Sequence, residues 1–308
     1  MTILDCRPFL AVGVSFIAAV LIAFSRRWPN LRETWSVIAS VLKFGIILSM
    51  LPAVLDGNQY QWTLCQITDT VGLTLRTDPA GMIFAVLASM LWVPMNFYSI
   101  GYMRCNNESE QTGYFAAFAI CMSAVMGIAM AENLLTFFIF YELLTLASYP
   151  LVLHKRNQEA LMASRKYLIY TLISGQLFLA GVIAVYCISG TMDFTPGGFL
   201  TTDMAPRWVL QAIFVLMILA GSVKAAVMPL HGWLPAAMIA PTPVSALLHA
   251  VAVVKTGVFA VLRIIGFVFG PKLLAEIGVV DVLAWAAAAS IIISSLIALR
   301  QDHLKRRL

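Results

Sequence analysis

Four ionisable side chains lie inside one long apolar stretch and could carry protons. Residues 221–258 read GSVKAAVMPLHGWLPAAMIAPTPVSALLHAVAVVKTGV and contain Lys224, His231, His249 and Lys255. A charge at the centre of a bilayer costs at least about 2.5 kcal/mol, so such residues usually face protein or water and serve a function. Histidine titrates near neutral pH, and burial disfavours the charged form of lysine. This combination favours a proton relay over a metal site.

The spacing of these residues limits which of them can touch the same neighbour. His249 and Lys255 are six residues apart, so in a helix they point about 120° away from each other. Water would have to connect them. A single buried histidine more often forms a hydrogen bond between helices, but its place beside Lys224 and Lys255 favours proton transfer.

One carboxylate also lies inside an apolar segment and could interact with these basic residues. Glu142 lies within NLLTFFIFYELLTLASYPLVL, residues 133–153. It could exchange protons with a lysine, or it could hold two helices together in a permanent ion pair, and both interpretations are open. Glu132 lies ten residues earlier, near the mouth of the same segment, where we favour a solvated or capping acid over a proton carrier.

A helix break is predicted at Pro229. Proline removes a backbone donor and clashes with the preceding turn, so a helix that passes through Met228 and Pro229 must kink or unwind. Unwound backbone at membrane depth needs protein or a water-filled cavity around it, and such breaks form ion sites in transporters. Lys224 is therefore predicted to lie beside a hydrated cavity. For His231, within the break, we favour a loop residue at the membrane interface.

Two further cations lie within apolar segments. Lys43 occurs in SVLKFGIIL with no surrounding motif, and it is interpreted equally well as a structural partner, a lipid-interface residue or a functional group. Arg263 lies near the end of its segment, where a long side chain can extend its charged group to the interface, and we predict that it does so.

The composition indicates an integral membrane protein. Apolar residues make up 61% of the 308 and charged residues 11%, whereas soluble domains have about 45–50% and about 25%. About 20 apolar residues cross a bilayer, and each such segment must be helical because lipid offers no hydrogen bonds to the backbone. The fold class is therefore all-α and polytopic. Nine helices are predicted: 8–24, 35–55, 79–101, 114–131, 134–153, 167–188, 208–228 with a continuation to about 240, 244–267 and 276–299.

Lysine and arginine indicate the orientation, because cytoplasmic loops are enriched in them. Of the 20 such residues, four lie within helices, four in loops on one side and twelve on the other. The N-terminus is therefore predicted outside and the C-terminus in the cytoplasm, with the chain in the inner (plasma) membrane of the cell. The net charge of +5 is explained by these loops, so nucleic acid is not expected as a partner. The twelve are Arg26, Arg27, Arg32, Arg104, Lys155, Arg156, Arg165, Lys166, Arg300, Lys305, Arg306 and Arg307.

No cofactor or metal is expected in this chain. The five cysteines occur singly, without a CxxC pair or a histidine at metal-ligand spacing. No nucleophile with a neighbouring base is apparent either, which disfavours an enzyme with its own active site.

Three segments resemble a known family. FYELLTLASYPLV, VKAAVMPLHGWLPAAMIAPTPVSALLHAVAVVKTGV and LTLRTDPAGMIFAVLASMLWVPMNFYSIGYM resemble the antiporter-like subunits of respiratory complex I, membrane-bound hydrogenases and Mrp sodium/proton antiporters. The resemblance extends from about residue 70 onward. It implies a fourteen-helix fold with two inverted five-helix repeats, of which this chain holds the first and the start of the second. The implied divisions are helices one to three (1–110), a proton-translocating core of helices four to eight (111–268), and helix nine with a cytoplasmic tail (269–308).

The resemblance also implies roles. Glu142 and Lys224 match the coupling ion pair of helices five and seven, and His249 and Lys255 match the helix-eight residues that lead from the input half-channel to the middle of the subunit. The implied function is proton translocation by a non-catalytic subunit of an NADH:quinone oxidoreductase or hydrogenase complex. The alternatives are a subunit of an Mrp-type Na⁺/H⁺ antiporter and a structural half-subunit without a complete channel.

The last residues, ALRQDHLKRRL, resemble the junction after helix nine, where relatives continue into the second repeat. We expect either a naturally split subunit, whose second half is a separate polypeptide, or a truncated chain. The expected partners are other membrane subunits, the lipid bilayer and protons, with Na⁺ as the other candidate ion.

Overall fold

The computed structural model describes residues 2–68 and 71–307, except for the side chains of 247–250 and 306. Within these residues, nine helical segments are long and apolar enough to span a membrane, as predicted. The chain is an integral membrane protein. The spans are α1 (Arg7–Phe24), α2 (Pro29–Leu55), α3 (Pro79–Cys105), α4 (Gln111–Ala129), α5 (Leu134–Val152), α6 (Gln158–Ser189), α7 (Arg207–Lys224), the segment Val253–Ile277 and α12 (Val280–Leu299).

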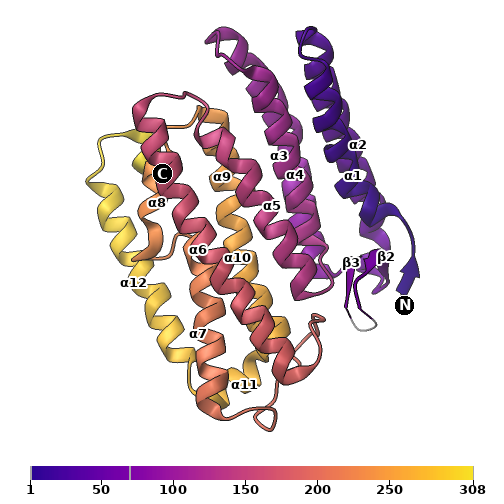
Figure 1. Cartoon of the computed structure of the whole chain (residues 1–308), viewed down its shortest axis with the longest axis vertical. Coiled ribbons are helices and arrows are strands. Elements are labelled where there is room, and N and C mark those ends of the chain that lie inside the picture. Colours follow the sequence, from indigo (N-terminus) through magenta and orange to yellow (C-terminus); the bar gives the residue numbers. More distant parts are fainter. Residues whose placement is uncertain (1, 69–70, 308) are drawn as a thin grey trace.

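Helix α4 forms the centre of the bundle. It packs against α1, α3 and α5 (Figure 1) and is buried on almost all sides. Its sequence contains no Asp, Glu, Lys or Arg, as expected of a helix that is surrounded by protein. Gly127 allows the ring of Phe140 on α5 to lie directly against α4. Helix α4 therefore separates α1–α3 from the helices that carry Glu142 and Lys224.

The predicted break in helix seven is confirmed. Helix α7 ends at Lys224, and the chain continues through a bend, with a positive φ of 56° at Ala226, into the short helices η1 (Leu230–Gly232) and α8 (Trp233–Ala237). The last carbonyl groups of a helix lack partners within it. One of them, on Val223, accepts a hydrogen bond from Trp233 Nε1 at 2.7 Å. The helix thus ends before Pro229, at the lysine itself.

The eighth segment is also interrupted, and the prediction of one continuous helix over 244–267 was wrong. Helix α9 (Thr242–Ala250) is separated from α10 (Val253–Arg263), which continues into the π-helix η2 (Ile264–Phe269) and α11 (Gly270–Ile277). The interruption contains no proline or glycine, so the local sequence carries no signal for it. Helix α10 packs on α7, and this tertiary contact outweighs the local helix preference.

A small sheet that was not predicted covers one end of the bundle. Strands β1 (Thr2–Leu4), β2 (Gln59–Gln66) and β3 (Gly72–Arg76) pair in that order, the first two parallel and the last two antiparallel. Asn133 fastens this sheet to α5, because its Nδ2 donates to the carbonyl of Gly72 at 2.8 Å. We call this end the sheet face and the opposite end, where α1 meets α2 and α5 meets α6, the basic face (Figure 1).

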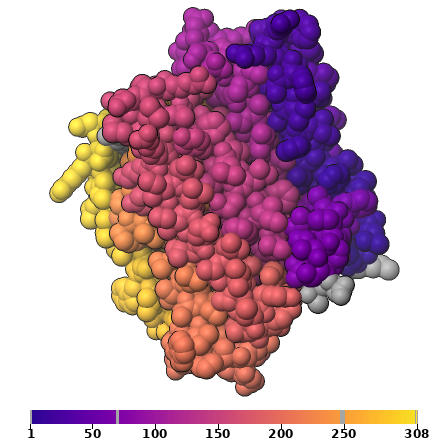
Figure 2. Space-filling view, viewed as in Figure 1, coloured from indigo at the N-terminus to yellow at the C-terminus, as the bar shows by residue number. Residues whose placement is uncertain are grey.

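Helix α12 lies at the edge of the molecule, where Figures 1 and 2 show it in yellow. None of its residues is buried, and Trp285, Ile291 and Leu296 are largely exposed. It approaches the broken helix through Ser290, whose hydroxyl accepts a hydrogen bond from the backbone of Met228 at 3.2 Å. An apolar helix this exposed is suited to contact with lipid or with other protein.

Candidate functional site

The ammonium of Lys224 lies in a fully buried site between α5 and α7. Its Nζ donates to the backbone carbonyl of Tyr141 at 2.5 Å and lies 3.2 Å from the centroid of the Tyr141 ring. The Tyr141 hydroxyl is hydrogen-bonded to Ser174 of α6 and donates to the carbonyl of Ala220 on α7, both at 3.1 Å. Three helices thus hold the tyrosine in place, and its ring stabilises the cation.

Glu142 follows Tyr141 on α5, and its carboxylate lies against Gly175 of α6. A side chain at position 175 would overlap this carboxylate, so the glycine leaves the space that Glu142 fills. Glu142 Oε1 is buried and has no hydrogen-bond partner among the described residues. Glu142 and Lys224 interact electrostatically, yet no N–O distance of 4.0 Å or less joins them. The structure therefore brings the predicted acid and base together without pairing them.

Close packing against α10 holds the end of α7 at Lys224. A Cβ on Gly257 of α10 would lie 2.6 Å from the carbonyl carbon of Lys224 and would overlap the backbone of Ala225. Only glycine therefore permits this approach. Lys224 occupies the last turn of its helix, where the partial negative charge of the helix end favours a cation.

The other predicted proton carriers are placed differently. Lys255 of α10 is exposed, and no hydrogen bond or ion pair joins it to Glu142 or Lys224 in the part of the chain that the structure describes. His249 belongs to α9, but its side chain lies outside the described residues. His231 lies in η1, within the predicted break, and is half-buried. Its Nδ1 has no partner among the described residues, and the side chain lines a groove of about 440 Å³ beside α12.

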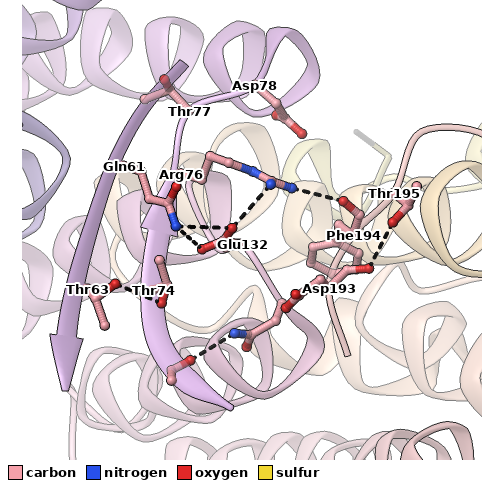
Figure 3. Close-up of polar contacts among 12 residues, drawn as sticks. Gln61, Thr63, Thr74, Arg76, Thr77, Asp78, Glu132, Asp193, Phe194 and Thr195 are labelled. Carbon is pink, nitrogen blue, oxygen red and sulfur yellow. Dashed lines mark hydrogen bonds and ion pairs between the residues drawn. The ribbon is translucent and has the colours of Figure 1, made fainter. Parts of the chain in front are cut away.

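Glu132 is an ion-paired residue of the sheet face, and the expectation of a solvated or capping acid was wrong (Figure 3). Its Oε1 lies 3.1 Å from Arg76 Nη1, and Gln61 Nε2 donates to the carboxylate at 3.0 Å. The adjacent Asn133 caps α5 instead, since its Oδ1 accepts from the backbone of Thr136. Burial raises the pKa of Glu132, and the charge of Arg76 opposes this shift.

Arg263 does not extend to the membrane interface, so that prediction was also wrong. The guanidinium is buried, and both terminal nitrogens donate to the carboxylate of Asp78, one of them at 2.9 Å. Its central carbon lies 4.6–5.0 Å from three phenylalanine ring centroids. Asp78 also caps α3 by accepting from the backbone of Gly81. The rings belong to Phe194, Phe259 and Phe267.

Lys43 of α2 is fully buried among protein side chains. Its Nζ donates to the carbonyl of Met122 on α4 at 2.8 Å and lies 4.9 Å from the centroid of the Trp92 ring on α3. These contacts exclude the lipid-interface interpretation and leave the structural and functional ones.

Sequence reasoning missed four residues that shape these sites. Each left a weak signal: an aromatic residue beside the intramembrane acid, two glycines within apolar helices, and an Asp-Pro pair at a helix start. None of these signals shows which distant residue the side chain or backbone contacts in the fold. The four are Tyr141, Gly175, Gly257 and Asp78.

Comparison with known proteins identifies the family of the chain. Residues 131–308 match the family model described as "NADH:quinone oxidoreductase/Mrp antiporter, TM". The chain belongs to this family. The resemblance found in the sequence is thereby confirmed.

Two curated relatives are named as an antiporter subunit and as a quinone oxidoreductase subunit. The chain is 28% identical over 272 residues to "Putative antiporter subunit mnhA2" of Staphylococcus haemolyticus, covering 88% of this chain and 33% of the relative. It is also 28% identical over 274 residues to "NAD(P)H-quinone oxidoreductase subunit 5, organellar chromatophore 1" of Paulinella chromatophora, covering 83% and 40%. The chain thus spans between a third and two fifths of the length of these relatives.

Solved structures confirm the fold of the antiporter-like subunits. The chain superposes with a TM-score of 0.86 and 23% identity on a chain of the membrane-bound sulfane sulfur reductase, an archaeal respiratory membrane complex, covering 98% of this chain and 61% of the other. A chain of the Mrp complex from Dietzia sp. DQ12-45-1b gives 0.84 and 23%, with coverage of 97% and 32%.

Proposed function

We propose that this chain is a proton-translocating membrane subunit in which Glu142 and Lys224 form a switchable pair. One observation carries the proposal. Lys224 is fully buried at the broken end of α7 and bound to a backbone carbonyl, while a carboxylate oxygen of nearby Glu142 has no hydrogen-bond partner among the described residues. A buried acid and base held close but unpaired can change their separation, and with it the proton affinity of each.

The geometry supports a simple cycle. When the carboxylate of Glu142 approaches, the ammonium of Lys224 gains a counter-charge and keeps its proton. When the carboxylate withdraws toward Gly175, the described residues that still stabilise the buried cation are the carbonyl and the ring of Tyr141, so release of the proton to water is favoured. Water then carries the proton toward His249 and Lys255. No covalent step is needed in this chain.

The partners and the orientation follow from the relatives and the charge distribution. Both relatives are named as subunits, and both solved neighbours are complexes, so we propose that this chain works beside other membrane subunits. The arginine- and lysine-rich basic face would lie in the cytoplasm of a cell with this chain in its inner membrane. Because a quinone oxidoreductase subunit and an antiporter subunit match at the same identity, coupling to a redox reaction and exchange against Na⁺ are both open.

The test replaces each member of the pair in the assembled complex. Glu142→Gln and Lys224→Ala should lower proton pumping, measured with a pH-sensitive dye in sealed vesicles, by at least about a hundredfold, as expected when a required proton carrier is lost. Lys272→Ala and Glu276→Gln are the matched controls, since they replace an exposed lysine and an exposed glutamate on α11. Both controls should pump normally.

Full pumping by either pair variant would refute the proposal. Poor assembly of Glu142→Gln, together with normal pumping by the assembled fraction, would instead support the structural half-subunit. A Na⁺ gradient that drives proton movement without a redox substrate would identify the Mrp-type alternative.

A further inference from the structure

The buried face of α2 is polar on one side of Lys43 and apolar on the other. Toward the basic face it carries Glu33, Ser36, Ser40 and Lys43, at spacings of three, four and three residues that place them on one side of the helix. We call these four residues the polar stripe. Toward the sheet face, the same side continues with apolar residues that are equally buried, each no more than 5% exposed. These are Ile47, Met50 and Val54.

Polar groups of neighbouring helices accompany the stripe. Ser36 Oγ donates to Asn96 Oδ1 of α3 at 2.7 Å, and Asn96 Nδ2 donates back to the carbonyl of Ser36 at 3.2 Å. Nearer the basic face, Tyr114 of α4 donates to Ser99 of α3 at 3.1 Å. All four side chains are buried. Three helices thus line the same half of the interior with hydroxyl and amide groups.

The inner end of the stripe has more donors than acceptors. A charged lysine carries three donors, whereas Lys43 makes one hydrogen bond to the part of the chain that the structure describes, to the carbonyl of Met122. The indole Nε1 of Trp92, whose ring lies beside Lys43, is buried without a partner among the described residues. A buried unsatisfied donor costs about 1–3 kcal/mol, and buried water commonly supplies the missing bonds. A water molecule beside Lys43 would supply a partner to both groups.

The outer end of the stripe opens at the basic face. Glu33 accepts from Arg32 and Arg104 and lines a surface groove of about 310 Å³. Its lining is mixed: the polar residues Asn30 and Thr34 lie beside the apolar Val37, Ile38 and Ile100. Glu33 is therefore the member of the polar stripe that borders solvent, and Ser36 lies three residues further into α2.

We propose that α2, α3 and α4 enclose a water-filled half-channel that runs from the basic face to Lys43, where a proton is exchanged with that face. Ile47, Met50 and Val54 close the route toward the sheet face. Helix α4 has no Asp, Glu, Lys or Arg and separates Lys43 from Glu142 and Lys224. The half-channel is thus distinct from the pair of the proposed function and does not depend on it.

Cysteine accessibility tests this half-channel on the assembled complex. The five native cysteines are replaced by alanine, and single cysteines are placed at Ser36, Ser40 or Lys43, or at Met50 as the control on the same buried face. A small cationic methanethiosulfonate reagent reacts with the thiolate, which forms only where the thiol meets water. Added from the basic face, it should label positions 36, 40 and 43 at least about tenfold faster than position 50.

Three labelling patterns would contradict the proposed half-channel. Equal protection of positions 36, 40, 43 and 50 would show a dry helix interface and overturn the half-channel. Labelling of position 50 as fast as position 40 would show that no apolar closure exists. Labelling at 36 and 40 but not at 43 would refute proton exchange at Lys43. Because serine and cysteine have nearly the same shape, the variants at 36 and 40 remain informative even if Lys43→Cys does not assemble.

Discussion

Two buried cations on adjacent helices differ in how they contact the nearest carboxylate. Arg263 of α10 is locked to Asp78 by two donors and surrounded by three aromatic rings. Lys224 of α7 has one carbonyl and one ring, and the carboxylate of Glu142 stays out of ion-pair range. Both are fully enclosed by protein, so burial alone does not separate a structural charge from a transport charge.

The two pairs differ in how many hydrogen bonds the carboxylate accepts. The carboxylate of Asp78 accepts hydrogen bonds from Arg263 and from the backbone of Gly81, so its position is fixed. Glu142 has a buried carboxylate oxygen to which none of the residues described by the structure donates a hydrogen bond. The planar fork of arginine matches a carboxylate with two parallel bonds, whereas a lysine ammonium is a point charge that can shift between acceptors. The first pair is suited to holding helices and the second to switching.

The largest effect should follow from opening the locked pair. Arg263→Ala leaves the carboxylate of Asp78 buried without its counter-charge, which typically costs about 3–5 kcal/mol. Lys224→Ala should cost much less, because Glu142 is not paired with it in this structure. Thermal unfolding of the purified complex in detergent measures both.

A melting temperature that falls equally in the two variants would contradict the distinction between the pairs. Arg263→Lys is the matched control for charge. It keeps the cation but loses the two-pronged geometry, so its stability should lie between those of the wild type and Arg263→Ala.

An intermediate effect should follow from filling the space beside the switchable acid. Gly175→Ala places a methyl group where the carboxylate of Glu142 now lies. The carboxylate must move, and the distance to Lys224 must change with it. Proton pumping should fall by about tenfold, because misplacement of a reacting group by about 1 Å can cost up to a hundredfold.

Gly101→Ala is the control for this substitution. Gly101 lies within α3, where an added Cβ meets no atom within 4 Å, so its effect should be limited to a small gain in stability. If Gly175→Ala pumps as well as Gly101→Ala, the position of the Glu142 carboxylate does not matter for transport.

The membrane-spanning helices, the break after Lys224 and the importance of Lys224 and Glu142 could be predicted from sequence. Long apolar segments have a single stable form in lipid, so the number of spans was predicted correctly, although the eighth begins at Val253 rather than at residue 244. The prolines near Lys224 predicted the break because their effect on a helix is local. The same segment drew attention to Lys224 and Glu142, since a charge in an apolar run stands out without knowledge of its neighbours.

The remaining features depend on contacts between distant residues. Arg263 and Asp78 are 185 residues apart, so a side chain that seemed free to reach the interface could not be assigned a partner. The interruption between α9 and α10 has no breaking residue, and Glu132 seemed solvated because Gln61 and Arg76 belong to strands that were not predicted. In each case tertiary packing overrides a local pattern.

The partly buried pair of Glu132 and Arg76 falls between the locked and the switchable pairs, and its pH dependence should be the smallest effect. Glutamate titrates near pH 4.5 when unperturbed, and burial raises the pKa of Glu132 in the folded protein. Well below pH 4.5 both states are protonated and the contribution of Glu132 to stability is complete. As the pH rises through the folded pKa, the unfolded state has already released its proton, so that contribution is lost.

Glu132→Gln should remove this dependence, because the amide stays neutral throughout. Across that pH window the melting temperature of the variant should fall less than that of the wild type, by an amount equivalent to less than about 1 kcal/mol, as is typical of partly exposed pairs. Asp193→Asn is the companion variant, since burial also raises the pKa of Asp193 at the same face. A wild-type stability that rises across this window, with either substitution flattening the rise, would mean that Arg76 outweighs burial and that this pair resembles the locked one.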